Sequence, residues 1–394
     1  MKICIDARCL MEERRTGVEE YTLNLLYNLF EIDNVNQYIL FLNSWRRTKT
    51  DFSWIKKYPN VTLKRFRIPN KILNLFFWYL NWPKIDKLAG KADIVFMPNI
   101  IFGSVSRNVK LITTIHDLSY ERHSEYFSLK RKGWHIFINP KKICQRANEI
   151  IAVSNSTKND LISLYQISPQ KIKVVYSACN DKFKIIDRNN IQLIKVKEKY
   201  SLPYKFIMYL GTIEPRKNII GLIKAYNQLQ YWAKKENQTE IQKFKLVIAG
   251  AKGWLNKKIY LEIANSEFKK KIRLIDFVSD QDKEYVYNLA SVFLYPSFFE
   301  GFGFPVLEAM QCGVPVIAGN NSSLPEVVGN AGILIDPDKP NEIAQALKEI
   351  LKDEKLRKIL VEKGLKKSKD FNWKKTAQET LDIINRINRS STSV

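Results

Sequence analysis

The sequence predicts an α/β protein in which two domains are each built on a parallel sheet. Short apolar runs typical of buried strands alternate with helical stretches, and this alternation favours parallel strands joined by crossover helices. The 394 residues are enough for two or three domains. A polar stretch without a clear period, 180–202, separates two such series. We therefore expect a first domain over 1–183, a second over 184–370, and a closing helix with a tail over 371–394.

The first series begins with an N-terminal strand and a charged loop, 8–17, that leads into a helix over 18–30, where apolar residues recur at helical spacing. A second helix is expected to include 161–165. The expected strands are 2–7, 38–42, 93–97, 111–115, 149–153 and 172–175.

The second series repeats the same alternation and ends in basic helices with a short frayed tail, 390–394. Its expected strands are 206–210, 244–249, 272–275, 292–295, 314–318 and 332–335. Its expected helices are 218–235, 281–290, 305–311, 323–328, 340–350 and those within 353–389.

Charge and composition narrow the class of protein. The 64 basic and 40 acidic residues give a formal charge of +24, which favours an anionic partner such as a nucleic acid, an acidic membrane surface or a phosphorylated substrate. Five scattered cysteines without a CxxC pair argue against a disulfide framework or a structural zinc site and fit the reducing cytosol. We expect neither a signal peptide nor a membrane span. We expect a cytoplasmic protein that is soluble or attaches peripherally to the inner face of the cytoplasmic membrane.

The stretch from Glu300 to Glu308, Glu-Gly-Phe-Gly-Phe-Pro-Val-Leu-Glu, is the strongest candidate for a binding site. It follows the expected strand 292–295, so it should lie at the carboxyl edge of the sheet, where α/β sheets bind ligands. Pro305 is suited to start the next helix, which places Glu308 near the amino end of that helix. Helix amides suit a phosphate, glycines allow close backbone approach, and two carboxylates could hold sugar hydroxyls. An ordinary turn with two solvated glutamates is the alternative.

A second candidate cluster opens the second domain at Gly211, in Gly-Thr-Ile-Glu-Pro-Arg-Lys-Asn. A strand ends there, and Asn218 is suited to cap the helix that comes next. Arg216 and Lys217 should therefore project from the same edge as Glu300. A guanidinium beside an ammonium suits a diphosphate, because the first clamps oxygens and the second neutralises charge. A solvated basic turn is the alternative.

Nearly the whole chain resembles the retaining nucleotide-sugar glycosyltransferases of family four, and most closely the bacterial mannosyltransferase-like branch that builds surface polysaccharides. The resemblance implies the GT-B fold, in which two Rossmann-like α/β/α domains face each other across a cleft and a C-terminal helix returns to the first domain. Besides the Glu300 and Gly211 stretches, the motifs that carry it are Leu246-Val-Ile-Ala-Gly-Ala-Lys-Gly-Trp254, Cys312-Gly-Val-Pro-Val316, Ser322-Ser-Leu-Pro-Glu326, Thr114-Ile-His-Asp-Leu118 and Val153-Ser-Asn-Ser156.

The resemblance implies a role for each matching residue of the second domain. Arg216 and Lys217 would bind the donor diphosphate and stabilise the leaving group, Glu308 would accept hydrogen bonds from the ribose, and Glu300 would hold hydroxyls of the donor sugar. Arg216, Lys217 and Glu300 are thus predicted to be catalytic. Further donor-binding positions are implied at Gly17, Gly211, Gly301, Phe302, Gly303, Phe304, Pro305 and Val306.

We expect neither a metal nor a cofactor, because fixed cations can stabilise a departing diphosphate electrostatically. The plausible Asp-x-Asp pair, Asp336-Pro-Asp338, is interpreted as a structural turn.

Two positions of the first domain also receive roles from the resemblance. His116 would face the donor sugar across the cleft as a catalytic residue, and a structural histidine is the alternative. Gly17 would lie near the diphosphate and the acceptor. The family's loop often reads Gly-x-Gly-Arg-Tyr, whereas this chain has Gly17-Val-Glu-Glu-Tyr21. Glu19 and Glu20 therefore put the role of the loop in doubt.

A basic stretch, 46–71, precedes a cluster of aromatic residues, and together they suggest a surface for anionic lipid. The alternative is a helix whose aromatic side chains pack into the first domain. The aromatic residues are Phe76, Phe77, Trp78, Tyr79 and Trp82.

The sequence thus predicts a retaining transferase that moves a hexose, mannose-like, from a GDP- or UDP-sugar to a glycan acceptor in polysaccharide or lipopolysaccharide biosynthesis. The expected acceptor is carried on a polyprenyl diphosphate. The alternative is a catalytically inactive binding protein on the same fold that contacts an anionic membrane or a nucleic acid. Because no nucleic-acid-binding motif is recognised, no nucleic-acid partner is expected.

Overall fold

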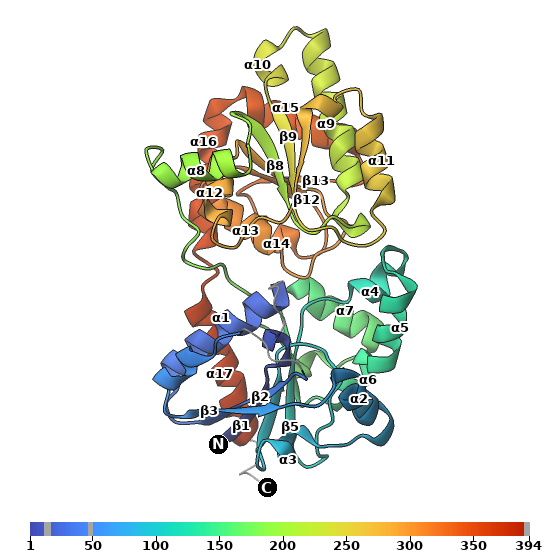
Figure 1. Cartoon of the computed structure of the whole chain (residues 1–394), viewed down its shortest axis with the longest axis vertical. Coiled ribbons are helices and arrows are strands. Elements are labelled where there is room, and N and C mark those ends of the chain that lie inside the picture. The colour runs from blue at the N-terminus through green and yellow to red at the C-terminus, as the bar shows by residue number, and fades with distance from the viewer. Residues whose placement is uncertain (12–16, 46–49, 390–394) are drawn as a thin grey trace. The chain divides into compact units, whose positions relative to one another are not determined.

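The computed structural model describes residues 1–11, 17–45 and 50–389, and the chain divides into two compact units (Figure 1). The first unit comprises Met1–Glu121, Leu129–Ala178 and the segment from Asn372 onward. The second comprises Arg122–Ser128 and Cys179–Phe371. Parts of the expected loop 8–17 and of the basic stretch 46–71, and the expected tail 390–394, lie outside the described residues.

The sheet of the first unit is parallel, with seven strands in the described residues in the order β3-β2-β1-β4-β5-β6-β7. The order reverses between β1 and β4, which makes the carboxyl ends of these two strands the switch point where such sheets bind ligands. The strands are β1 (Lys2–Asp6), β2 (Gln37–Asn43), β3 (Val61–Phe66), β4 (Ile94–Met97), β5 (Lys110–Ile115), β6 (Glu149–Ala152) and β7 (Ile172–Val174).

Helices pack around this sheet, and the last helix of the chain is one of them (Figure 1). The hydroxyl of Thr376 in α17 donates to the carbonyl of Tyr176 at 2.8 Å, and the ring of Trp373 lies 5.8 Å from that of Tyr21 in α1. This confirms the predicted return of the C-terminal helix. The helices are α1 (Gly17–Ile32), α2 (Asn70–Leu75), α3 (Ile85–Leu88), α4 (Ser119–Arg122), α5 (Leu129–Ile138), α6 (Pro140–Arg146), α7 (Asn155–Tyr165) and α17 (Trp373–Arg389), with a π-helical turn η3 (Phe76–Leu80).

The second unit has a parallel sheet of six strands in the described residues, in the order β10-β9-β8-β11-β12-β13. Its order reverses between β8 and β11, so the switch point lies at their carboxyl ends. The strands are β8 (Phe206–Leu210), β9 (Lys245–Ala249), β10 (Ile272–Ile275), β11 (Val292–Tyr295), β12 (Val316–Gly319) and β13 (Ile333–Ile335).

The helices of the second unit alternate with these strands, and α10 and α11 were not predicted from the sequence. They are α8 (Ile191–Lys199), α9 (Ile219–Lys235), α10 (Thr239–Gln242), α11 (Lys257–Asn265), α12 (Lys283–Leu289), α13 (Phe304–Gln311), α14 (Leu324–Val328), α15 (Pro340–Lys352) and α16 (Glu354–Ser368). Among the helices that the structure describes, we find none whose length and apolar character would let it span a bilayer.

Candidate functional site

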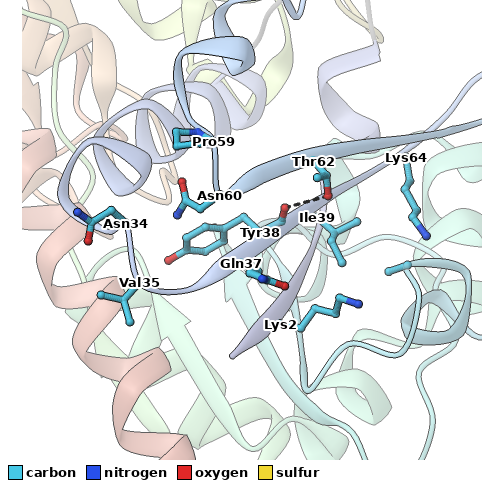
Figure 2. A pocket seen from close by; sticks show the side chains of 11 residues that line it. Lys2, Asn34, Val35, Gln37, Tyr38, Ile39, Pro59, Asn60, Thr62 and Lys64 are labelled. Atoms are coloured by element: carbon cyan, nitrogen blue, oxygen red, sulfur yellow. Dashed lines mark hydrogen bonds between the residues drawn. The ribbon is translucent and has the colours of Figure 1, made fainter.

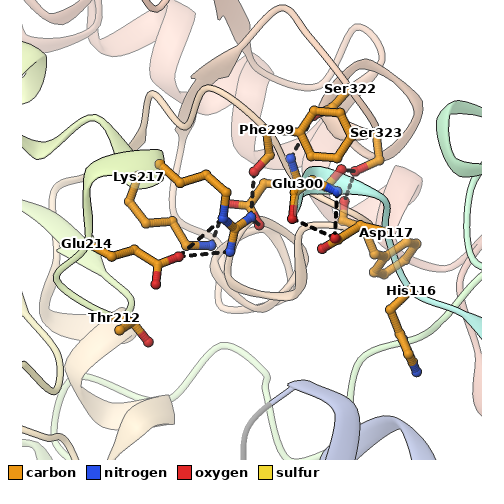
Figure 3. Close-up of polar contacts among 12 residues, drawn as sticks. His116, Asp117, Thr212, Glu214, Lys217, Phe299, Glu300, Ser322 and Ser323 are labelled. Carbon is orange, nitrogen blue, oxygen red and sulfur yellow. Dashed lines mark hydrogen bonds and ion pairs between the residues drawn. The ribbon is translucent and has the colours of Figure 1, made fainter. Parts of the chain in front are cut away.

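Both candidate stretches of the second unit lie at its switch point. The loop with Arg216 and Lys217 follows β8, and the loop with Glu300 follows β11, its neighbour in the sheet. Figure 3 shows the side chains of Lys217 and Glu300 next to each other. Two segments more than eighty residues apart in the chain are thus brought together because their strands are adjacent and parallel.

Lys217 and Glu300 form a buried ion pair at the centre of this cluster. The Nζ atom of Lys217 donates to Oε1 of Glu300 at 2.6 Å and to the hydroxyl of Tyr295 at 3.0 Å. Both charged side chains are more than nine-tenths buried. Two hydrogen bonds to one ammonium offset much of the cost of burying it. The pair therefore fixes the position of the Glu300 carboxylate.

Arg216 ties the two loops together with its planar guanidinium. Its Nη1 donates to the carbonyl of Phe299 at 2.6 Å and to Oε2 of Glu300 at 3.3 Å. Its Nη2 and Nε donate to Oε1 of Glu214 at 2.9 and 3.2 Å. The cluster thus alternates two cations with two carboxylates, and its formal charges cancel.

The protonation states follow from this arrangement. Burial alone would raise the pKa of Glu300, but the charges of Lys217 and Arg216 outweigh it and lower the pKa to about 2. Burial, and then the neighbouring charge of Arg216, lowers the pKa of Lys217. Glu300 is therefore a carboxylate at neutral pH, a permanent negative charge at the carboxyl edge of the sheet.

Two serines hold the backbone of the Glu300 loop (Figure 3). The amide of Glu300 donates to Oγ of Ser322 at 2.9 Å. The hydroxyl of Ser323 donates to the carbonyls of Glu300 and Phe302 at 3.0 and 2.8 Å. These bonds explain the place of Ser322-Ser323 in the sequence pattern, because they fix the turn that presents the carboxylate.

The loop ends in a left-handed glycine that leads into α13. Gly303 has φ = 111°, and a Cβ atom there would lie 2.9 Å from Cδ2 of Leu324, so the loop requires glycine at this position. Helix α13 starts at Phe304, one residue before the predicted start, and Pro305 occupies its first turn. Gly303 accepts hydrogen bonds from the amides of Val306 and Leu307 through its carbonyl.

Glu308 lies in the middle of α13, and the sequence-based placement near the amino end of the helix was wrong. The helix has only eight residues, so its fifth residue is more than one turn from the start. The carboxylate of Glu308 accepts a hydrogen bond from the hydroxyl of Tyr287 in α12 at 2.7 Å. Burial raises the pKa of Glu308 above its usual value. The two glutamates of the motif therefore occupy different electrostatic surroundings.

The turn after β8 is built as the sequence predicts. Asn218 adopts a left-handed conformation with φ = 53°, and its Oδ1 caps α9 by accepting from the amide of Gly221 at 3.1 Å. Gly211 is packed so closely that a Cβ atom would lie 2.8 Å from the hydroxyl of Tyr209. These contacts hold Arg216 and Lys217 at the strand edge.

In the first unit, His116 directly follows β5. Its Nε2 lies 2.9 Å from the carbonyl oxygen of Pro98, which follows β4, and its ring packs edge-on against Tyr21 at 4.8 Å. A carbonyl can only accept, so Nε2 carries a proton. Burial lowers the pKa of His116. The neutral ring therefore leaves the lone pair on Nδ1.

The predicted Gly17 loop is the first turn of α1. Glu19 and Glu20 both lie in this turn, where the helix dipole favours negative charge. Glu20 also receives a hydrogen bond from Asn24 at 3.3 Å. The helix start thus gives a structural reason for two acidic residues at positions where the family pattern has glycine and arginine.

The Asp336-Pro-Asp338 pair forms a turn after β13. The carboxylate of Asp336 accepts from the amide of Asp338 at 3.0 Å and pairs with Lys339 at 3.0 Å. Across the described ranges, no group of three or more histidine, cysteine, aspartate or glutamate side chains is arranged to hold a metal ion.

A hollow of about 560 Å³ lies elsewhere, at the amino-terminal ends of β1, β2 and β3 (Figure 2). Its lining includes Lys2, Gln37 and Thr62, the hydroxyl of which donates to the carbonyl of Tyr38. This is the sheet edge opposite to His116. The hollow is therefore no part of the candidate site.

Three residues of the site were not singled out from the sequence: Glu214, Tyr287 and Tyr295. Glu214 lies inside the motif that begins at Gly211, and its position two residues before Arg216 is the signal that could have identified it. In the structure this residue is 2% exposed. Tyr295 ends β11 and its hydroxyl faces Lys217, which an apolar strand run does not reveal. Tyr287 belongs to another helix and could be found only in three dimensions.

Comparisons with known proteins agree with this geometry. The profile "Glycosyl transferases group 1" matches residues 190–367, and the profile "Glycosyltransferase Family 4" matches residues 15–183. The chain is 33% identical over 279 residues to the O-antigen chain mannosyltransferase B of Escherichia coli, covering 69% of each protein. The serotype-specific mannosyltransferase WbdA of Escherichia coli is 32% identical over 285 residues, but the chain spans only 34% of that longer protein.

A relative from Campylobacter jejuni is 30% identical over 327 residues, which are 80% of this chain and 82% of that protein. It is an N-acetylgalactosamine-N,N'-diacetylbacillosaminyl-diphospho-undecaprenol 4-alpha-N-acetylgalactosaminyltransferase. Among solved structures, HepE of Anabaena in complex with UDP and glucose superposes with a TM-score of 0.72 at 15% identity, covering 98% of this chain and 100% of that one. The chain therefore belongs to the family 4, or group 1, glycosyltransferases and has their GT-B fold, built from two Rossmann-like domains.

Proposed function

We propose that this glycosyltransferase moves a mannose-like hexose from a GDP- or UDP-sugar to a glycan acceptor, with retention of the anomeric configuration. The buried cluster of Glu300, Lys217 and Arg216 at the switch point is the observation that carries the proposal. The relatives of the chain include mannosyltransferases of O-antigen chains, which supports a role in surface polysaccharide or lipopolysaccharide biosynthesis. The Campylobacter relative acts on a diphospho-undecaprenol, which supports a lipid-linked acceptor here.

The cluster supplies the electrostatics that this reaction needs. Negative charge develops on the departing diphosphate and positive charge on the oxocarbenium-like sugar. The cationic groups of Arg216 and Lys217 would face the diphosphate, with Glu214 and Glu300 keeping the two cations in place. Glu300, ionised at neutral pH, would hold sugar hydroxyls and stabilise the cationic sugar. Fixed charges that need no reorganisation lower the barrier more than mobile ones do.

The remaining donor contacts rest on the local geometry. Glu308 would accept hydrogen bonds from the ribose, oriented by the hydroxyl of Tyr287. The backbone from Gly301 to Val306 would contact sugar and phosphate where the left-handed Gly303 leads into α13. In the first unit, Nδ1 of His116 would accept a hydrogen bond from a hydroxyl of the donor sugar. Gly17 would lie near the diphosphate and the acceptor.

A thermal-shift screen with GDP-, UDP- and ADP-sugars tests the donor class. A donor that binds the folded chain stabilises it by about 2.7 kcal/mol at a hundredfold excess over its dissociation constant. We expect a nucleotide-hexose donor to raise the melting temperature of the wild type. The same donor should raise the melting temperature of Glu308→Gln less. The anomeric configuration of the product, read by NMR, tests retention. A β-linked product from an α-linked donor would contradict it, and a lack of response to every nucleotide sugar would contradict the donor class.

A further inference from the structure

An exposed apolar surface of the first unit is left without a partner. Large hydrophobic side chains are exposed in two segments, six over 72–82 and four over 129–137. Three of the four exposed tryptophans in the described residues belong to it. Large exposed apolar patches usually mark an interaction site. The side chains, together called the α2–α5 surface, are Ile72, Leu75, Trp78, Tyr79, Leu80, Trp82, Leu129, Trp134, Ile136 and Phe137.

The two segments form one surface although residues 83–128 separate them in the chain. The rings of Trp78 in η3 and Phe137 in α5 meet edge-on with their centroids 5.3 Å apart. Phe77 is buried in the core of the unit and anchors η3, whereas its neighbours Trp78 and Tyr79 are 50% and 76% exposed. Of the alternatives left by the sequence, core packing thus holds for Phe77 and not for Trp78 or Tyr79.

The two stretches of chain that carry the α2–α5 surface hold charge of one sign. Residues 70–85 and 129–148 contain no aspartate or glutamate. They contain eight lysines and arginines, of which Arg131 and four lysines, Lys71, Lys130, Lys141 and Lys142, are exposed. Among the residues that the structure describes, these four lysines make no ion pair with a carboxylate. An apolar partner with a negatively charged rim is therefore the complement.

We propose that the α2–α5 surface docks the enzyme on an anionic lipid bilayer. Tryptophan and tyrosine favour the boundary between headgroups and acyl chains, and exposed lysines of the same stretches of chain attract anionic headgroups. A second copy of the chain fits less well, because a symmetric dimer would place two basic surfaces against each other. A nucleic acid would satisfy the lysines but would leave Leu80, Leu129 and Ile136 without an apolar contact. Docking would bring the enzyme to a lipid-linked acceptor but does not depend on that acceptor.

Vesicle binding by the full chain tests the proposal. We expect binding to vesicles of phosphatidylcholine with phosphatidylglycerol and little binding to phosphatidylcholine alone. Trp78→Ser with Phe137→Ser should lower the bound fraction about tenfold. The matched control is Tyr204→Ser with Leu261→Ser, which removes two exposed apolar side chains of the second unit and should bind like the wild type.

A charge series separates the two contributions. Lys130→Gln, Lys141→Gln and Lys142→Gln together should reduce binding to the anionic vesicles. The matched control is Lys363→Gln with Lys366→Gln and Lys369→Gln, which removes the same charge from exposed positions of the second unit. This control should bind the anionic vesicles like the wild type. Circular dichroism melts test whether each variant is folded. Trp78→Phe with Trp82→Phe keeps the surface apolar, so it should still bind vesicles while its tryptophan quenching by brominated lipid falls.

Equal binding to neutral and anionic vesicles would overturn the proposal, and so would patch variants that bind like their controls. A wild type that dimerises, with monomeric patch variants and no vesicle binding, would assign the surface to a second copy instead. Donor stabilisation measured without vesicles tests the proposed function separately. A chain that binds vesicles but no nucleotide sugar would contradict only the function, and the reverse would contradict only the docking surface.

Discussion

At Glu300, one carboxylate pairs with two cations, the buried Lys217 and the partly buried Arg216. Glu300→Gln keeps the shape of the side chain but leaves both cations without this countercharge. We expect transfer to fall by about a hundredfold or more, because the charge facing the developing cation is lost. We also expect a stability loss of about 3 kcal/mol, the usual cost of breaking a buried pair.

Steady-state kinetics and urea unfolding measure the two effects of Glu300→Gln. The matched control is Glu354→Gln, which breaks the exposed pair with Lys358 and should change stability by less than about 0.5 kcal/mol. Full activity in Glu300→Gln would remove Glu300 from the catalytic site.

The same residue sets a pH dependence of stability. Its pKa falls from an ordinary 4.5 to about 2 on folding. A lowered pKa means that the stabilisation is complete above pH 4.5 and is lost as the pH falls from there toward 2. The stability difference between the wild type and Glu300→Gln should therefore be large near neutral pH and shrink below pH 4.5. Urea midpoints of both proteins across this range measure it, and a difference that grows on acidification would contradict the ionised state.

Tyr287 orients Glu308 through one hydrogen bond, so Tyr287→Phe tests the ribose contact. We expect the KM for the donor to rise about fivefold with little change in kcat, because a binding contact and not a reacting group is disturbed. Tyr226→Phe is the control, since it removes a hydroxyl bonded to the backbone of Phe244 in the same unit. A fall in kcat at constant KM would place Glu308 at the reacting atoms instead.

At the level of elements, the turn into α13 depends on the left-handed Gly303. Gly303→Ala should destabilise the second unit by about 1 to 3 kcal/mol, because alanine strains at this φ and its Cβ meets Leu324. It should also weaken donor binding, which thermal shift measures. Gly364→Ala, in the interior of α16 with only ordinary contacts to Met310, should be neutral or stabilising. Equal effects at both glycines would mean that the turn is not special.

The elements differ in how far the sequence could predict them. Strands β8, β10 and β11 have the bounds that the sequence predicts, and β8 and β11 are buried along their whole length. Strand β3 was missed because it is an edge strand with four consecutive exposed residues, so no run of buried side chains marks it. The edge that holds Arg216, Lys217 and Glu300 could be predicted from strand ends alone. Their direct pairing could not, because a sequence gives neither the neighbour of Arg216 nor the partner of Glu308.

At the level of the whole molecule, the C-terminal segment belongs to a different unit from the residues that precede it in the sequence. Helix α17 follows the second unit in the chain but packs in the first, where Ile384 is fully buried. Ile384→Ala should therefore loosen the first unit by about 2 to 5 kcal/mol. Its reciprocal control is Ile350→Ala in α15, an equally buried isoleucine of the second unit.

Hydrogen exchange followed by mass spectrometry distinguishes these two changes. Amides of β1 and β5 should exchange faster in Ile384→Ala while those of β8 and β11 keep their protection, and Ile350→Ala should show the opposite pattern. Each unit has its own core, so a cavity in one should reach the other only weakly. Faster exchange in both sheets from either substitution would mean that the two units unfold as one cooperative body.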